Sequence, residues 1–106
     1  MKPPLQALLI AGEEMRDDVF AGRKKITIRE GHRDYQVDKP LILCCDKLNW
    51  ATMKTVTGVR HTTLRDVTWP EMSADGFGNY AHMERSLRQF YPQIGPDSPV
   101  TVISWN

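Results

Sequence analysis

The chain has 106 residues, of which 41% are hydrophobic and 25% are charged, and its net charge is +1. This length supports one domain, because domains typically contain about 100 to 150 residues. The composition is close to the globular average and excludes a disordered chain, a collagen-like repeat and a coiled coil. A charge so near zero excludes a protein held on nucleic acid by bulk charge alone. We expect a single domain over residues 1–106.

The cysteines Cys44 and Cys45 are adjacent. Neighbouring side chains on a strand point to opposite faces, so the two thiols are poorly placed to form a disulfide with each other or to hold one metal ion. The apolar run near the N-terminus covers only residues 5–11, and no stretch approaches the ~20 apolar residues of a membrane span. We expect a cytoplasmic protein with reduced thiols and no membrane contact.

The first quarter of the chain predicts a strand, a helix and a second strand. Leu8–Ile10 is a short apolar run, and residues 13–21 form an amphipathic helix that Gly22 closes. Lys25–Arg29 alternates polar and apolar residues, which is typical of a half-buried strand. The apolar face of this strand holds Ile26 and Ile28, and its polar face holds Lys25, Thr27 and Arg29.

Two further strands are predicted after a polar loop over residues 30–39. Pro40 opens a strand that continues from Leu41 to Asp46. The β-branched stretch Thr52–Thr63 forms the next strand, with a kink at Gly58.

The C-terminal part predicts two helices and a last strand. Residues 68–71, with sequence TWPE, have the spacing of a capping box at the start of a short helix, which Asp75–Gly78 breaks. Asn79 can cap the next helix, and Val100–Trp105 is a final strand paired inside the sheet. The order of elements predicts an α+β domain built around a small mixed or barrel-like sheet. The second helix carries an apolar stripe of Tyr80, Met83, Leu87 and Phe90 that we assign to the core.

The basic residues are concentrated in one part of the chain. Residues 23–65 contain ten basic and four acidic residues, a net charge of +6, and the remainder carries −5. One face can therefore be locally basic, or the basic side chains can be scattered over a solvated strand surface.

The run Ala21–Arg29, with sequence AGRKKITIR, resembles the Gly-x-Lys-x-x-(Glu/Thr)-x-Arg motif of the ASCH-domain family. The order of Asp75–Phe77, an amphipathic helix closing with Phe90–Pro92 and the final strand Val100–Trp105 is similar to the C-terminal half of small ASCH proteins. The resemblance covers most of the chain. It implies a PUA-like fold, a small β-barrel of mixed strands flanked by helices.

The resemblance also implies a catalytic set. The threonine form of the motif, Lys-x-x-Thr-x-Arg, is similar to the amidohydrolases that deacetylate N4-acetylcytidine, and it matches Lys24 and Thr27 to their catalytic lysine and threonine. Asp75 is the best match to a glutamate that completes the family's set, although its side chain is one methylene shorter. We expect the Asp75 side chain to be exposed to the pocket. The expected substrate-binding residues are Arg23, Lys25, Arg29 and Tyr35, the last by stacking on a nucleobase.

This set supports a coherent acyl-transfer chemistry. A threonine hydroxyl is a poor nucleophile until a base takes its proton, and a lysine amine is such a base only where its pKa is lowered from about 10.4. A carboxylate can orient the lysine or relay a proton to the leaving amine, and Arg29 or backbone amides can hold the oxyanion. No metal ion or cofactor is required, and the three histidines have no mutual ligand spacing.

One conflict concerns the lysine. Strict alternation places Lys25 on the same face as Thr27, whereas the family match selects Lys24. Either the strand starts after Lys24 or a bulge turns it, and Lys25 stays as the alternative.

Two functions of different class remain open. The first is a metal-free amidohydrolase acting on N4-acetylcytidine or a related N-acylated nucleoside. The second is a non-catalytic RNA-binding module, which the wider PUA-like group implies and which the basic segment over residues 23–65 would serve. We expect no DNA-specific readout and a monomeric protein.

Overall fold

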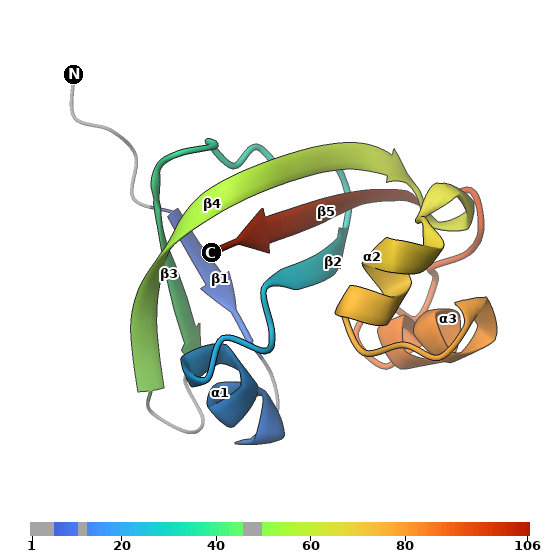
Figure 1. The fold of residues 1–106 in the computed structure, drawn as a ribbon. Helices are drawn as coiled ribbons and strands as arrows, with labels where there is room; N and C mark the ends of the chain where they lie inside the picture. Colours follow the sequence, from blue (N-terminus) through green and yellow to red (C-terminus); the bar gives the residue numbers. More distant parts are fainter. Residues whose placement is uncertain (1–5, 11–12, 46–49) are drawn as a thin grey trace.

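The computed structural model describes residues 6–10, 13–45 and 50–106 of the chain. In chain order its elements are β1 (Gln6–Leu9), α1 (Glu13–Phe20), β2 (Ile26–Glu30), β3 (Pro40–Cys45), β4 (Trp50–Thr63), the short 3-10 helix η1 (Leu64–Asp66), α2 (Trp69–Ala74), α3 (Tyr80–Arg88) and β5 (Pro99–Trp105). Figure 1 shows a curved sheet with α1 near one end and with α2 and α3 near the other.

The strands are hydrogen-bonded in the order β1-β3-β4-β5-β2. β1 runs parallel to β3, and the other neighbouring strands are antiparallel. β4 pairs with β3 through its first half and with β5 through its second half, and its register shifts between Val56 and Gly58. An irregularity of this kind bends and twists a strand, so β4 arches across the sheet in Figure 1. The kink predicted at Gly58 is confirmed.

The predicted α+β class is confirmed, whereas the closed barrel is not. β1 pairs only with β3 and β2 pairs only with β5, so both are edge strands among the described residues. The sheet curves without closing, because its two edges do not meet in a hydrogen-bonded pair.

β5 is the strand around which the core is organised. Its side chains alternate between the two faces of the sheet, so Val100 and Val102 join one hydrophobic cluster and Ile103 and Trp105 join another. The first of these clusters is covered by residues of η1 and α3, including Leu64, Met83 and Leu87. The second also contains residues of α1, β3 and β4, including Val19, Leu41, Leu43 and Val56.

The predicted helix signals are confirmed in detail. Thr68 and Glu71 form the capping box of α2, and Asn79 caps α3 by accepting a hydrogen bond from the His82 backbone N–H. The predicted core stripe is wrong at one position: Phe90 lies beyond the end of α3, and its side chain is 61% exposed. No helix within the described ranges is long and apolar enough to span a membrane.

Gly58 supports a first prediction about the β4–β5 register. A Cβ added at this position would lie 2.8 Å from Ser104 Oγ, a separation that van der Waals contact forbids. We expect Gly58→Ala to lower the free energy of unfolding by about 1–3 kcal/mol, measured by urea denaturation.

The control is the same substitution in a Ser104→Ala background. Ser104 Oγ is the atom that the added Cβ meets within 4 Å, so its removal should relieve most of the cost. An equal loss of stability in both backgrounds would contradict the steric explanation.

Candidate functional site

The candidate site lies on the outer edge of β2. Trp105 N–H donates to Lys25 O at 2.9 Å, and Gly31 N–H donates to Pro99 O at 2.7 Å. Backbone N–H and C=O groups alternate in direction along a strand, so those of the odd-numbered residues between Lys25 and Gly31 point toward β5. The N–H and C=O groups of Ile26 and Ile28 consequently point to the open edge, where no strand of the described ranges meets them.

Lys24 and Asp75 occupy that edge in place of a strand. Lys24 Nζ donates a hydrogen bond to Ile26 O at 2.8 Å, and the Asp75 carboxylate accepts one from the Ile28 backbone N–H. The two side chains also bond to each other, with 2.5 Å between Lys24 Nζ and Asp75 Oδ1. The pair therefore satisfies backbone groups that an edge strand otherwise leaves open.

The pair is almost completely removed from solvent. The Lys24 side chain is 9% exposed and the Asp75 side chain is 6% exposed. The expectation of an exposed Asp75 is therefore wrong, because its carboxylate is drawn inward by the ammonium and by the strand edge. A charge pair buried in this way loses hydration on both partners, and only their mutual contact and further hydrogen bonds offset that loss.

The chain around Lys24 holds it at the start of β2. The Lys24 backbone N–H donates to Asp18 O of α1 at 3.0 Å, and Trp105 Nε1 donates to Lys24 O at 3.1 Å. Gly22, with φ of +77°, provides the left-handed turn that ends α1. Because β2 begins at Ile26, Lys24 lies outside the alternating segment, and the conflict between Lys24 and Lys25 disappears.

Asp75 is held at the C-terminal end of α2. The Gly76 N–H donates to Ser73 O at 3.0 Å and the Phe77 N–H donates to Met72 O at 2.9 Å. With Gly76 at a φ of +90°, these two bonds form a Schellman motif, in which a left-handed glycine closes a helix. The sequence Asp75-Gly76-Phe77 thereby sets the direction in which the carboxylate leaves the helix.

Burial dominates the electrostatics of the carboxylate. It raises the pKa of Asp75 above its ordinary value, while the charge and hydrogen bond of Lys24, the charge of Arg29 and the Ile28 N–H oppose the increase. A carboxyl held in this balance accepts a proton more readily than one in water. Its closest partner for hydrogen bonding is the Lys24 ammonium.

Thr27 and Arg29 lie on the same face of β2, beside the pair. Lys24 Nζ bonds to the carbonyl of the Ile26–Thr27 peptide, so the ammonium lies next to the Thr27 backbone. The Thr27 side chain is buried, at 5% exposure, opposite Ile103 of β5. No described hydrogen bond joins Lys24 directly to the Thr27 hydroxyl.

The other expected binding residues lie apart from the pair. Arg23 forms an ion pair with Asp18 at 2.8 Å and is mostly exposed, and Lys25 is exposed. Tyr35 packs against the hydrophobic cluster that contains Trp105, with its hydroxyl 3.5 Å from Ala7 O. The structure therefore brings together Lys24, Asp75 and Arg29 and leaves Arg23, Lys25 and Tyr35 without a described contact to the pair.

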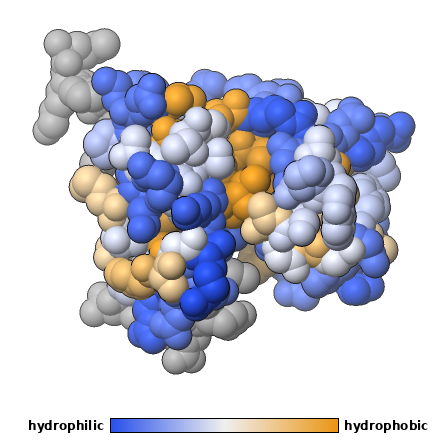
Figure 2. Space-filling model, viewed as in Figure 1, coloured by the Kyte–Doolittle hydropathy of each residue, from blue (hydrophilic) through white to orange (hydrophobic). Residues whose placement is uncertain are grey.

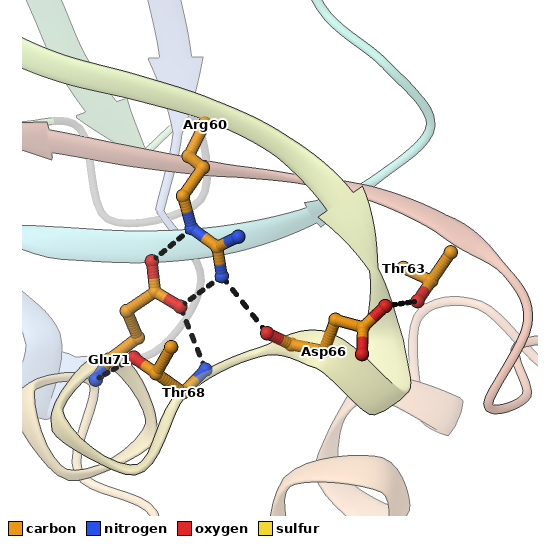
Figure 3. A network of polar contacts seen from close by, with 5 residues as sticks. All are labelled: Arg60, Thr63, Asp66, Thr68 and Glu71. Carbon is orange, nitrogen blue, oxygen red and sulfur yellow. Dashed lines mark hydrogen bonds and ion pairs between the residues drawn. The ribbon is translucent and has the colours of Figure 1, made fainter.

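A second polar network, which the sequence did not reveal, lies one turn of α2 from Asp75. Arg60 of β4 donates to both carboxylate oxygens of Glu71, at 2.8 and 2.6 Å (Figure 3). The sequence predicts the capping box over Thr68–Glu71. The pairing of the Glu71 carboxylate with Arg60 of β4 depends on the fold. Among the described residues, no group of three or more His, Cys, Asp or Glu side chains is placed to hold a metal ion.

Hydrophobic residues also reach the surface near β2. Figure 2 shows them at the centre of this face, between hydrophilic regions toward either end of the molecule. Ile26 contributes an incompletely buried side chain to this part of β2.

Comparison with known proteins supports the fold. Neither a protein family model nor a curated protein sequence matches the chain. The ASCH domain from Lactobacillus crispatus JV V101 superposes with a TM-score of 0.72 and 14% identity, over 96% of this chain and 78% of that one. A DUF984 protein from Enterococcus faecalis V583 gives 0.71 and 14%, over 100% of this chain and 82% of that one. The ASCH protein from Zymomonas mobilis gives 0.64 and 10%, over 96% and 65%. The chain therefore has the ASCH-domain fold, as its sequence motifs predict.

The buried pair generates a prediction about stability. Asp75→Asn leaves the Lys24 ammonium without its charged partner, so we expect it to lower the free energy of unfolding by about 3–5 kcal/mol. The double variant Lys24→Met/Asp75→Asn removes both charges and should be less destabilised than the sum of the two single variants. Guanidinium denaturation at pH 7 measures the free energy of unfolding of wild type, Lys24→Met, Asp75→Asn and the double variant. Strictly additive losses would contradict a coupled pair.

The second network predicts a dependence on pH. Hydrogen bonds from Arg60 lower the pKa of Glu71 below its ordinary value of 4.5, with burial opposing and Thr68 assisting. A lowered carboxyl pKa means that folding favours the ionised form, so its stabilisation is complete above the unfolded pKa and is lost as pH falls through the folded pKa.

We expect wild-type protein to exceed Glu71→Gln in stability at pH 7, by up to about 1 kcal/mol because Arg60 is partly exposed. The difference should shrink below about pH 4.5. Urea denaturation between pH 3 and pH 7 measures it, and a difference that grows on acidification would contradict the assigned sign.

Proposed function

We propose that this protein is a metal-free amidohydrolase that removes the acyl group from N4-acetylcytidine or a related N-acylated nucleoside. The observation that carries the proposal is the buried Lys24–Asp75 pair bonded to the Ile26–Thr27 peptide. The ASCH-type motif over Ala21–Arg29 and the ASCH-domain fold support it further. The proposal includes a cytoplasmic, monomeric protein.

In the first half of the proposed reaction, Thr27 is the nucleophile. In the proposal a proton passes from Lys24 to Asp75, a carboxyl whose pKa is raised by burial, and leaves a neutral amine. The amine takes the Thr27 hydroxyl proton as the oxygen attacks the acyl carbonyl. Arg29, on the same face of β2, is suited to stabilise the oxyanion that forms.

The second half releases both products. The tetrahedral intermediate breaks its C–N bond, and the exocyclic amine of the base leaves with a proton from Lys24. Water then attacks the acyl-Thr27 ester while Lys24 takes its proton, the C–O bond to Thr27 breaks, and Lys24 returns that proton to the Thr27 oxygen as the carboxylic acid leaves. Asp75 finally returns to Lys24 the proton that it received at the start. The net reaction consumes one water and returns Lys24, Thr27 and Asp75 to their initial protonation states.

The proposed substrate contacts differ in their structural support. The charge of Arg29 opposes the increase in the pKa of Asp75, so it acts electrostatically on the pair. The hydrophobic surface near β2 in Figure 2 is suited to the apolar face of a nucleobase. We retain Arg23, Lys25 and Tyr35 as proposed binding residues. The substrate would contact them away from the buried Lys24–Asp75 pair.

RNA binding is a second candidate, favoured by a separate observation. Several basic side chains from residues 23–65 are exposed, among them Arg23, Lys25 and Lys39. Exposed basic side chains bind a phosphate backbone with strong salt dependence. A protein that makes 6–10 phosphate contacts loses about 10³–10⁵ in affinity between 50 and 200 mM salt. An enzyme that binds a free nucleoside should show little salt dependence. The salt dependence of binding over this range therefore separates the two functions.

The direct test incubates the protein with N4-acetylcytidine and follows formation of cytidine and acetate. We expect Thr27→Val to lower kcat by at least about 1,000-fold, because it removes the nucleophilic oxygen and keeps the shape of the side chain. Thr27→Ser should retain measurable turnover, because the hydroxyl remains.

Thermal melting of each variant provides the control for folding. Thr27→Val protein that is folded and deacetylates as fast as wild type would contradict the assigned nucleophile. A wild-type protein without any turnover on N-acylated nucleosides would contradict the enzymatic proposal and favour the RNA-binding one.

A further inference from the structure

We infer that Arg60 and Glu71 are positioning residues that hold Asp75 against Lys24 and the edge of β2. Among the described interactions, neither side chain bonds to Lys24 or to the Asp75 carboxylate. Both act through α2, the helix of six residues that ends immediately before Asp75.

Arg60 fastens the start of α2 to the sheet. Its guanidinium donates to Glu71 Oε2 at 2.8 Å and to Oε1 at 2.6 Å, and also to Asp66 O at 3.1 Å (Figure 3). Glu71 Oε1 accepts a further bond from the Thr68 N–H at 2.8 Å. A planar guanidinium bound to both oxygens of a carboxylate fixes orientation as well as distance.

The backbone of α2 transmits this position to Asp75. Glu71 O accepts the Asp75 N–H at 3.1 Å, so the fastened residue and the carboxylate are one hydrogen-bonded turn apart. No residue of α2 is fully buried, although the partly buried Met72 packs against the hydrophobic cluster that contains Val100 and Val102. A helix this short is marginal without tertiary contacts. The Arg60–Glu71 ion pair attaches its first turn to β4, whereas Asp75 attaches its C-terminal end to β2.

The geometry that α2 must preserve is demanding. Asp75 contacts both Lys24 Nζ, at 2.5 Å, and the Ile28 N–H. A displacement of roughly 1 Å in a reacting group can cost ~100-fold in rate. The effect on catalysis rests on the proposed function, whereas the effect on the position of Asp75 does not.

Amide hydrogen exchange tests the position directly. Arg60→Gln/Glu71→Gln breaks the network while leaving the net charge unchanged. The Ile28 N–H is bonded to Asp75, whereas the Thr27 and Arg29 N–H groups face β5. We expect the Ile28 amide to exchange about tenfold faster in the double variant, with little change at Thr27 and Arg29.

Arg65→Gln is the matched control. Arg65 lies on η1 and pairs with Asp97 at 2.7 Å, both largely exposed, so this variant loses an arginine ion pair of the same region that does not hold α2. Its Ile28 exchange should equal that of wild type. Unchanged Ile28 exchange in the double variant, or an equal increase at Ile28, Thr27 and Arg29, would overturn the inference.

Kinetics then measure the consequence for the proposed reaction. We expect the double variant to lower kcat on N4-acetylcytidine by about 10- to 100-fold with little change in KM, because the substrate contacts remain and the reacting groups move. The single variant Arg60→Lys, in which Glu71 is kept, should have a kcat between those of wild type and the double variant. Its ammonium cannot bind both carboxylate oxygens in one plane. If wild-type protein has no turnover, the proposed function fails while the exchange result still decides the positioning role.

Discussion

The contact between Lys24 and Asp75 is the constraint on which the site depends. β2 is an edge strand, and an edge exposes unpaired backbone groups that need partners. An ammonium that binds Ile26 O and a carboxylate that binds the Ile28 N–H meet this need together. Their burial has a cost in hydration that a simple apolar contact would avoid. The hydrogen bonds to Ile26 O and the Ile28 N–H offset part of that cost.

Segments distant in the chain converge to form the pair. Lys24 and Asp75 are 51 positions apart, one following α1 and the other ending α2. β5 makes this possible, because it is buried on both faces and pairs with both β2 and β4. Arg60 extends from β4 to α2, so the sheet that places Lys24 also places the helix that carries Asp75.

Local sequence patterns predicted most elements of this fold. The strand predicted from Lys25–Arg29, the capping box at Thr68 and the kink at Gly58 depend on interactions within a few residues, and a strand, a capping box and a register shift are present there. The predicted burial of β2 is wrong at Thr27, which is buried beside Ile28, because both faces of this strand are covered. Phe90 was misassigned because helical periodicity does not say where a helix ends. The order of elements left a mixed or a barrel-like sheet open, and the family resemblance implied the barrel. Closure would need pairing between β1 and β2, a tertiary property that no local pattern reports.

For the site, the sequence alone determined that Lys24, Thr27 and Arg29 stand at one helix-to-strand junction, because three residues within six positions cannot be far apart. It also singled out Asp75 through a family motif. Only the tertiary structure decided that the Asp75 carboxylate is buried against Lys24, that Tyr35 packs against the outside of a core cluster and that Arg60 pairs with Glu71 of α2. These outcomes depend on which side chains meet across strands and helices distant in the chain, and such contacts are set by the packing of the whole domain rather than by neighbouring residues.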